Sequence, residues 1–406
     1  MKRLSFLLLT ARCSLLPTLL FAQMEWICAT NSAGWSARRG HTSVVFDNKM
    51  WILGGEGTYP GRRNDVWLST DGVNWTQVTS SAPWSARYDH TSVVFNNKIW
   101  VFGGYGGSND VWNSTDGENW TLATLSAGWT PRLGHTSVVF DNKIWVLGGW
   151  DDSLRNDVWY STDGVDWFQA TNSAGWSRRA HHSSVVFDNK IWLFGGQDGT
   201  YKNDVWYSTD GVNWLIATSS APWSARYGHK SVVFDNKIWL LGGYDYSSRI
   251  NDVWYSTDGM NWICATDSAG WSKRWGHSSI VFDNRIWVLG GYVESNIEND
   301  VWYSRGLGIR EERSTLDAIR LTPEIYPNPA KSVIRVRYPW SDKGSRLIQA
   351  IKIFDVSGKL IREITSPPKA DRNDRIGEIK ISLKGINPGL YFLVLGKETT
   401  KLMVVK

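Results

Sequence analysis

Several features that would define a class of protein are scarce or absent in these 406 residues. No stretch after residue 22 is long and apolar enough to cross a bilayer, so we expect no transmembrane helix there. The chain has only three cysteines and seven histidines, and six of the histidines recur at one repeated position. We therefore expect neither a disulfide framework nor a metal site, because the side chains that most often build them are few.

In place of these features the chain has a sequence motif that occurs six times between Met24 and Ser304. Each copy begins with W-(S/T)-x-R-x-x-H, continues through an apolar run that ends in Gly-Gly, and then reads Asn-Asp-Val-Trp. A Ser-Thr-Asp-Gly turn and another tryptophan complete the copy. The repeated histidines lie 45 to 49 residues apart, a period typical of β-propeller blades: His41, His90, His135, His182, His229 and His277.

The second copy contains four strand signals separated by turn residues. Thr91 to Phe95 and Lys98 to Phe102 are apolar runs joined by Asn96-Asn97. A third strand opens at Asp110-Val111-Trp112, and Asp116-Gly117 turns the chain into a fourth strand. Asn-Asn and Asp-Gly pairs tolerate the positive φ values that tight hairpin turns need. Four antiparallel strands per copy predict one propeller blade.

The two ends of the repeat region are expected to share a blade. The sixth copy stops at Ser304 without its fourth strand, and the missing sequence stands at the other end of the region. There, Trp26-Ile27-Cys28-Ala29-Thr30 is identical to Trp262-Ile263-Cys264-Ala265-Thr266 of the fifth copy. We therefore predict that the N-terminal strand completes the sixth blade and closes the ring. The propeller should have six blades and no seventh.

These residues resemble the kelch repeat family of β-propellers. The resemblance rests on R-x-x-H, the Gly-Gly doublet after an apolar strand, Asn-Asp-Val-Trp and the last-strand tryptophan, and it covers about 280 residues in six copies. Of the 27 tryptophans, 24 occupy four fixed positions per copy, and Trp150, Trp275 and Trp340 fall outside them. A tryptophan repeated in every blade is expected to pack between neighbouring sheets.

The first 22 residues are typical of a secretory signal peptide, with Lys2 and Arg3 followed by leucine-rich stretches. Its removal would take Cys13 away and leave Cys28 and Cys264 at the same fourth-strand position of neighbouring blades. Equivalent outer-strand positions of adjacent blades should lie farther apart than the roughly 7 Å limit between Cα atoms for a disulfide. We expect two buried thiols that form no bridge.

The composition changes after Ser304, where a polar, arginine-rich linker of residues 305–324 begins. The order Tyr-Pro-Asn-Pro, Ile-Phe-Asp-Val-Ser-Gly-Lys and Leu-Tyr-Phe-Leu-Val in residues 325–406 resembles the type A sorting domain of the type IX secretion system. That resemblance implies a small β-sandwich in an exported protein of Bacteroidota, with the secretion machinery as its partner. The predicted fold is thus all-β: a signal peptide, a propeller of residues 23–304, a linker and a C-terminal β-sandwich.

The two modules differ in charge. Residues 23–304 carry 21 Lys and Arg against 28 Asp and Glu, a balance of −7, whereas residues 305–406 carry 20 against 11, a balance of +9. An acidic propeller is poorly suited to nucleic acid, whose binding depends on neutralising phosphates. The basic tail fits recognition by a carrier or an acidic surface, and it equally fits an ordinary soluble domain.

Two sets of loops are expected on the same face of the propeller, those between strands four and one and those between strands two and three. The second set follows each Gly-Gly and varies strongly between copies, and variable loops on a rigid scaffold commonly carry function. Aromatic rings cover the C–H faces of sugars, and guanidinium groups clamp acid groups. The candidate ligand-binding residues from the two sets are Arg38, Arg87, Arg132, Arg179, Arg226, Arg274, Tyr59, Tyr105, Trp150, Tyr201, Tyr244 and Tyr292. The arginines have an alternative role as hydrogen-bond partners of neighbouring strands, because the same residue occurs in every blade.

Catalysis is the alternative to binding. Kelch-type propellers include copper radical oxidases and sialic-acid epimerases, so the resemblance permits chemistry without implying it. The oxidase would need a tyrosine crosslinked to cysteine, and Cys28 and Cys264 fall in outer strands remote from the axis. A hydrolase or epimerase needs an asymmetric acid and base pair. Asp89 and His181, which replace the glycine before the repeated histidine in two copies, are the candidates.

We therefore predict an exported binding or adhesion module at the outer-membrane surface or outside the cell. Its ligand is an extracellular glycan or protein, and we expect a monomer without a cofactor, metal ion or nucleic-acid partner. The alternative function is a carbohydrate-active enzyme, epimerase- or hydrolase-like, that uses the same funnel. A third interpretation is a structural surface protein without a small ligand.

Overall fold

The computed structural model of the protein describes residues 24–58, 61–105 and 109–305, and seven strands between residues 324 and 404. The chain divides into two units, Met1–Arg310 and Glu311–Lys406. The predicted signal peptide lies outside the described residues, as does the predicted linker apart from its two end residues. Among the described residues, no helix is long and apolar enough to cross a membrane.

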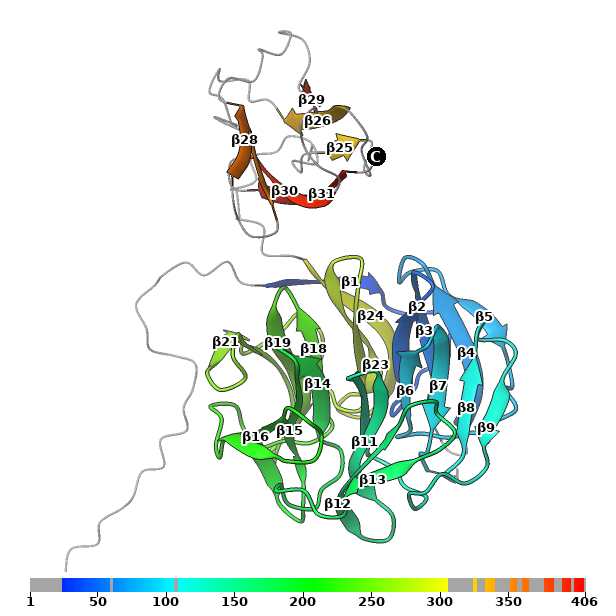
Figure 1. The fold of residues 1–406 in the computed structure, drawn as a ribbon. Coiled ribbons are helices and arrows are strands. Elements are labelled where there is room, and N and C mark those ends of the chain that lie inside the picture. The colour runs from blue at the N-terminus through cyan, green and yellow to red at the C-terminus, as the bar shows by residue number, and fades with distance from the viewer. Residues whose placement is uncertain are drawn as a thin grey trace, which may run out of the picture. The chain divides into compact units, whose positions relative to one another are not determined.

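The first unit contains six four-stranded antiparallel sheets, which are the blades of a propeller (Figure 1). Blade 1 consists of β2 (Thr42–Phe46), β3 (Lys49–Glu56), β4 (Arg62–Ser69) and β5 (Thr76–Thr79). Blade 2 consists of β6 (Thr91–Phe95), β7 (Lys98–Phe102), β8 (Val111–Ser114) and β9 (Thr121–Thr124). Blade 3 consists of β10 (Thr136–Phe140), β11 (Lys143–Trp150), β12 (Leu154–Ser161) and β13 (Phe168–Thr171). Blades 4 and 5 consist of β14 (Ser183–Phe187), β15 (Lys190–Gln197), β16 (Tyr201–Ser208) and β17 (Leu215–Thr218); and β18 (Lys230–Phe234), β19 (Lys237–Tyr244), β20 (Arg249–Ser256) and β21 (Trp262–Thr266).

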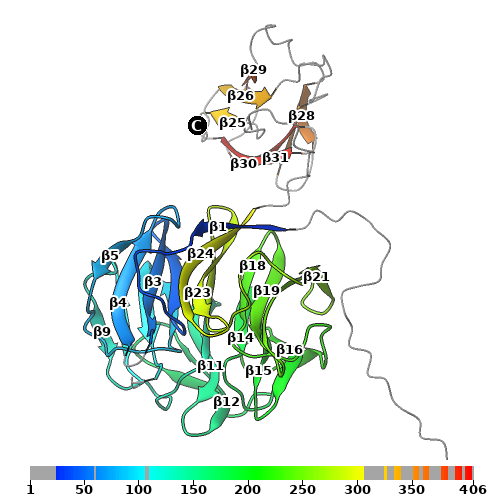
Figure 2. The same cartoon turned by 180° about the vertical axis from the view of Figure 1, so that it is seen from behind.

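The sixth blade joins the two ends of the unit, as predicted. It contains β22 (Ser278–Phe282), β23 (Arg285–Tyr292) and β24 (Ile297–Arg305), and its outermost strand is β1 (Glu25–Thr30). In the register of β1 with β24, Trp26 lies opposite Ser304 and Cys28 opposite Trp302. Figures 1 and 2 show β1 beside β24 from opposite sides. The prediction of six blades closed by the N-terminal strand is confirmed.

The turn residues adopt the backbone conformation that their sequence predicts. Each β-hairpin that links the first two strands of a blade has two Asp or Asn residues with φ between 46° and 55°, such as Asn96 and Asn97. At the Asp-Gly turns the glycine also has positive φ, and it packs against the preceding blade. A Cβ atom on Gly117 would lie 2.1 Å from the Trp51 ring, so no other residue fits there.

Tryptophan pairs form the core between adjacent blades. The tryptophan that begins each copy is 0–1% exposed, and it meets the fourth-strand tryptophan of the same copy edge to face, as Trp84 meets Trp120 at 5.8 Å between ring centroids. The pair Trp26–Trp271 has the same geometry at 5.9 Å, so the closing blade is packed like the others. Such aromatic pairs stabilise a fold by about 0.5–1.5 kcal/mol each beyond their burial.

The two cysteines of the propeller match the sequence prediction in part. Within the described residues no disulfide joins Cys28 to Cys264, as predicted. Both side chains are half-buried rather than buried, because they lie on the outermost strands of their blades. The Cys28 thiol donates to Asn31 Oδ1 at 2.9 Å, and partial burial raises the pKa of this thiol.

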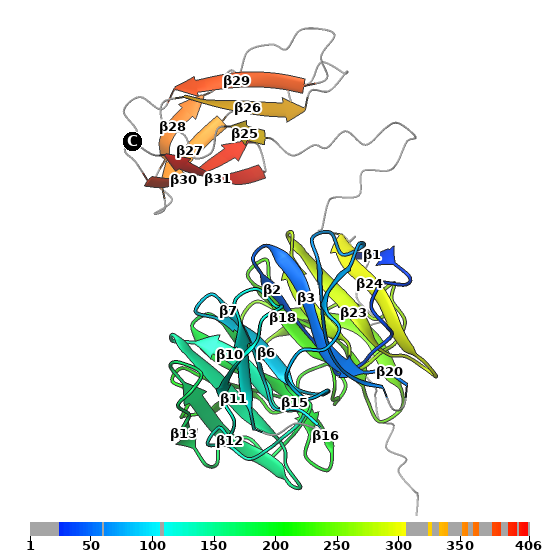
Figure 3. The same cartoon turned by 90° about the vertical axis from the view of Figure 1, so that its right-hand side faces the viewer.

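The second unit forms two antiparallel sheets. One contains β25 (Glu324–Tyr326), β26 (Val333–Pro339) and β29 (Ile376–Ser382), and the other contains β27 (Ile351–Asp355), β28 (Leu360–Ile364), β30 (Gly389–Leu395) and β31 (Glu398–Val404). Figure 3 shows β26 beside β29 and β30 beside β31, as their registers require. The strands confirm the all-β prediction for this region, and the packing of the two sheets into a sandwich stays a prediction.

Candidate ligand-binding site

The repeated arginines lie inside the blades rather than on a ligand-facing surface. Arg87 is fully buried, and its guanidinium makes two parallel hydrogen bonds of 2.8 Å to the carboxylate of Asp110. The remaining donors bond the carbonyl oxygens of Gly103 and Ser85 and the Ser85 hydroxyl, so all five N–H groups have acceptors. The same set of bonds recurs around Arg38, Arg132, Arg179, Arg226 and Arg274.

This arrangement favours the structural role that the sequence left open for these six arginines. The side chains are 0–1% exposed, and each aspartate comes from the Asn-Asp-Val-Trp segment of the same blade. A guanidinium that is buried and already donates all five of its N–H groups cannot form a hydrogen bond with a ligand. The six arginines are therefore not candidates for ligand contact in the folded propeller.

A closed ring of backbone hydrogen bonds surrounds the propeller axis at the residues that precede the repeated histidines. Each residue donates its N–H to the carbonyl of its counterpart in the preceding blade, and the six bonds are 2.7–3.1 Å long. The ring residues are Gly40, Asp89, Gly134, His181, Gly228 and Gly276. All six have φ between 52° and 64°, a region in which glycine is favoured.

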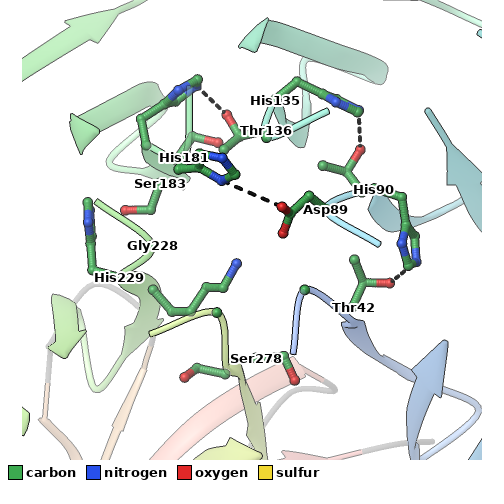
Figure 4. Close-up of a pocket in the computed structure, with 18 of the residues that line it drawn as sticks. Thr42, Asp89, His90, His135, Thr136, His181, Ser183, Gly228, His229 and Ser278 are labelled. Carbon is green, nitrogen blue, oxygen red and sulfur yellow. Dashed lines mark hydrogen bonds and ion pairs between the residues drawn. The ribbon is translucent and has the colours of Figure 1, made fainter. Parts of the chain in front are cut away.

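Asp89 and His181 are thus the two ring residues with side chains, and the structure brings these side chains together. The Nδ1 atom of His181 lies 3.9 Å from Oδ2 of Asp89, and both side chains are mostly buried (Figure 4). Burial lowers the pKa of His181, and Lys230 and Arg39 add to this, whereas the Asp89 carboxylate acts in the opposite direction. The separation is longer than a hydrogen bond, so the two groups interact through their charges when His181 is protonated.

Lys230 is a third departure from the repeat at the axis, and sequence reasoning missed it. The residue after the repeated histidine is threonine or serine in the other five copies. In four blades that hydroxyl bonds the histidine of the next blade, as Thr42 bonds His90 at 3.1 Å. Lys230 cannot accept such a bond, and Nε2 of His277 has no partner among the described residues. The single lysine at this repeat position was the sequence signal.

These three residues line an axial cavity of about 200 Å³. Hydroxyl groups and the repeated histidines form most of the remaining wall, as Figure 4 shows for Thr42, Thr136 and Ser183. Burial lowers the pKa of the Lys230 ammonium, and Asp89 acts in the opposite direction. The cavity therefore combines a cation, a carboxylate, an imidazole and neutral hydroxyls.

The variable loops place aromatic side chains around the mouth of this cavity. Backbone bridges such as Tyr88 to Tyr105 and Tyr227 to Tyr244 join the two predicted sets of loops, which confirms that they share a face. Tyr105 and Trp150 are each 40% exposed, and Tyr201, Tyr244 and Tyr292 are half-buried. Tyr59 lies outside the described residues.

Sequence reasoning also missed the residue that follows each repeated arginine. Tyr88, Tyr227 and Trp275 occupy this position, and Trp275 lines the axial cavity. The Tyr227 ring contacts the rings of Tyr201 at 4.9 Å and Trp275 at 5.5 Å. Arg39 occupies the same position in blade 1 and lies over the rings of Tyr88, Trp275 and Tyr292 at 5.0–5.9 Å. The residue after the repeated arginine differs strongly from copy to copy, and this variation was a signal that the sequence contained.

A shallow hollow of about 380 Å³ lies beside the mouth, between blades 2 and 3. Tyr105, Trp150 and Leu133 supply its apolar wall, and Asp151, Asp152 and Arg155 supply its polar wall. Asp151 accepts hydrogen bonds from Arg155 and Thr130, which lower the pKa of its carboxyl against the opposing effect of burial. An aromatic wall beside an ionised, fixed carboxylate suits a pyranose ring with free hydroxyls.

Among the residues that the structure describes, no group of three or more His, Cys, Asp or Glu side chains is arranged to hold a metal ion.

Comparison with known proteins identifies both units. The family model described as the KLHDC2/KLHL20/DRC7 Kelch-repeats domain matches residues 40–214 and 181–306. The chain therefore belongs to the Kelch-repeat family, which confirms the resemblance found in its sequence. The Secretion system C-terminal sorting domain model matches residues 324–406. This domain indicates export by the type IX secretion system to the cell surface or the extracellular space.

Two individual proteins show how far these likenesses extend. The solved structure of YjhT matches with a TM-score of 0.56 and 16% identity, over 67% of this chain and 96% of that one, a likeness of fold alone. The β-agarase A of Zobellia galactanivorans is 33% identical over 88 residues, which is 22% of this chain and 14% of the agarase. The chain thus matches a small part of that relative, through a segment too short to cover the propeller.

Proposed function

We propose that the propeller is a glycan-binding module whose ligand lies across the aromatic mouth and into the hollow beside it. The observation that carries this proposal is the gathering of ring faces on the variable loops. Tyr105 and Trp150 flank one hollow, and Tyr246 is 65% exposed and stacks on Tyr201 at 4.2 Å on the other side of the mouth. Exposed rings of this kind cover the C–H faces of sugars.

The pattern of the repeat also supports a role for these aromatic residues in ligand binding. Blades that are nearly identical in their strands differ in their loops only on this face, and four of the six Gly-Gly doublets are followed directly by Tyr or Trp. Burial gives no reason for these residues, because their rings remain partly exposed. A sorting domain that directs export places this face where extracellular glycans occur.

The test is a glycan array probed with the full chain and with a variant in which Tyr105, Trp150, Tyr244 and Tyr292 are alanine. A matched control is Phe168→Ala, which removes a 52% exposed ring from the outer strand β13. We expect the first variant to lose binding and the control to retain it. Binding that survives the first variant, or is absent from the whole array while a surface protein binds the mouth, would overturn the proposal.

A second candidate function is catalysis at the axis, and the approach of His181 to Asp89 is the observation that favours it. A proton donor and acceptor at the base of a sugar-binding funnel could exchange a proton with a ring hydroxyl. The substitutions Asp89→Asn and His181→Gln separate the two functions. We expect glycan binding to persist in both, and any turnover of the bound glycan to be lost. Binding that itself depends on these two residues would place them in recognition instead.

A further inference from the structure

Several cations of the funnel face form no ion pair with a carboxylate among the described residues, and Arg62, Arg249 and Lys230 are three of them. Among the described residues no Asp or Glu oxygen lies within 4 Å of the charged nitrogens of Arg62, Arg249 or Lys230. Other cations of this face are compensated: Arg39 pairs with Glu56 at 2.8 Å, and Arg155 pairs with Asp151 at 2.7 Å. Arg62 and Arg249 are therefore uncompensated within that distance in a propeller whose overall balance is negative, whereas the carboxylate of Asp89 acts on Lys230 from beyond 4 Å.

Two of these cations lie over tyrosine rings. The guanidinium carbon of Arg62 lies 4.1 Å from the ring centroid of Tyr105, and that of Arg249 lies 4.5 Å from Tyr292 and 5.9 Å from Tyr244. Stacking of this kind uses the face of the guanidinium and leaves its N–H edge available. The Nε–H of Arg249 is buried and has no acceptor among the described residues, so the terminal nitrogens are the donors considered for a ligand. Two N–H groups of a guanidinium can donate parallel hydrogen bonds to an oxyanion.

The third cation lies at the centre of the ring. Lys230 belongs to blade 5, and its positive charge lowers the pKa of His41, His90 and His277 in blades 1, 2 and 6. Its side chain also lines the axial cavity, so the ammonium lies near the axis. Lys230 has no hydroxyl to offer His277, whose Nε2 has no partner among the described residues.

We propose that the glycan recognised by this face is anionic, with one carboxylate or sulfate group on Lys230 at the axis and further acid groups on Arg249 and Arg62. This inference rests on the proposed function and names the class of its ligand. Aromatic rings would hold the sugar faces, while the cations select for charge. The negative balance of the remaining propeller disfavours polyanions elsewhere, so the preference should depend on these residues.

The experiment compares matched pairs of probes on the full chain by calorimetry. One pair is an oligogalacturonate and its methyl ester, and the other is a sulfated galactan and its desulfated form. A charge-assisted hydrogen bond is worth at least about 1.5 kcal/mol, so the acidic member of one pair should bind at least about tenfold more tightly. The pair that shows this preference identifies the acid group.

Lys230→Thr is the decisive variant, because it restores the residue type that the other copies carry and should fold. We expect it to lose about tenfold in affinity for the acidic probe and to keep its affinity for the neutral one. Lys237→Thr is the matched control: it removes the same charge from the same blade, at the β18–β19 turn, where Lys237 pairs with Asp235. It should bind like the unchanged protein.

Each other outcome overturns the inference in a recognisable way. Equal binding of acidic and neutral probes leaves glycan binding intact and removes the charge preference. An equal loss in Lys230→Thr and Lys237→Thr shows general electrostatics rather than a site at the axis. If no member of either pair binds, the proposed function and this inference fail together.

Discussion

The imidazole of His181 approaches the carboxylate of Asp89 to 3.9 Å although a whole blade separates them in the ring. The intervening ring residue is Gly134, and a Cβ atom there would lie 2.9 Å from the His181 ring. The approach of the two side chains therefore depends on Gly134, which is distant from both residues in the sequence. It places a carboxylate of blade 2 and an imidazole of blade 4 side by side near the axis.

Replacing these two residues by glycine should separate stability from function. Both have φ near 52°, which is unfavourable for a side chain, less so for Asp than for His. We expect His181→Gly to raise the free energy of unfolding by about 0.5–1 kcal/mol and Asp89→Gly to change it less. Urea denaturation of each variant measures this. A loss of more than about 1 kcal/mol would show that the pair stabilises the ring.

Acid should unfold the propeller through its buried histidines. Burial is the largest effect that lowers the pKa of the six repeated histidines, to about 3 for His135. An unfolded chain binds protons near pH 6.5. Because the folded pKa is the lower one, the contribution to stability is present above pH 6.5 and is lost as the pH falls. Between the folded and unfolded pKa values, each histidine lowers the free energy of unfolding by about 1.4 kcal/mol for every unit by which the pH falls.

Six such terms would exceed the stability of an ordinary domain within about two pH units. We therefore expect unfolding between about pH 6 and 4, followed by tryptophan fluorescence, since 26 of the 27 tryptophans lie in residues 23–304. A urea midpoint that stays constant from pH 7 to 5 would contradict the burial of neutral histidines.

Removing one repeated arginine should be far more damaging than removing a surface one. Arg132→Met leaves the carboxylate of Asp157, which is 12% exposed, without its cation, and we expect a loss of about 3–5 kcal/mol. Arg305→Met breaks the ion pair with Glu25 on the surface, where the two side chains are 53% and 58% exposed, and should lose less than about 1 kcal/mol. Thermal unfolding of both variants checks the contrast, and similar losses would refute it.

The glycine of the Asp-Gly turn should tolerate no side chain. Gly117→Ala places a Cβ atom 2.1 Å from the Trp51 ring at a φ of 75°, so the adjacent blade must shift. We expect a loss above about 3 kcal/mol. Gly199→Ala provides the control, because its φ is 100° and nothing lies within 4 Å of the added atom. It isolates backbone strain of roughly 1–2 kcal/mol, and equal losses would mean that the ring contact is unimportant.

The repeat made the scaffold predictable and the site only partly so. Six copies in register, with Trp26 to Thr30 matching Trp262 to Thr266, were sufficient for the blade count and the closure. The sequence left both a ligand-binding and a structural role open for the six arginines, because their aspartate partners lie 23–27 residues away and only the folded blade pairs them. Lys230 departs from the repeat as Asp89 and His181 do, but only the folded ring shows that all three line one cavity at the axis.

The ring of backbone bonds also determines what kind of field a ligand meets at the axis. Its six N–H groups all point the same way around the circle, so their dipoles run tangentially and cancel along the axis. No amide proton of the ring is left to cradle an anion, whereas its carbonyl oxygens retain a lone pair each. The axial potential is therefore not a property of the fold. Three side chains determine it, and exchanging them would give the same scaffold a different polarity.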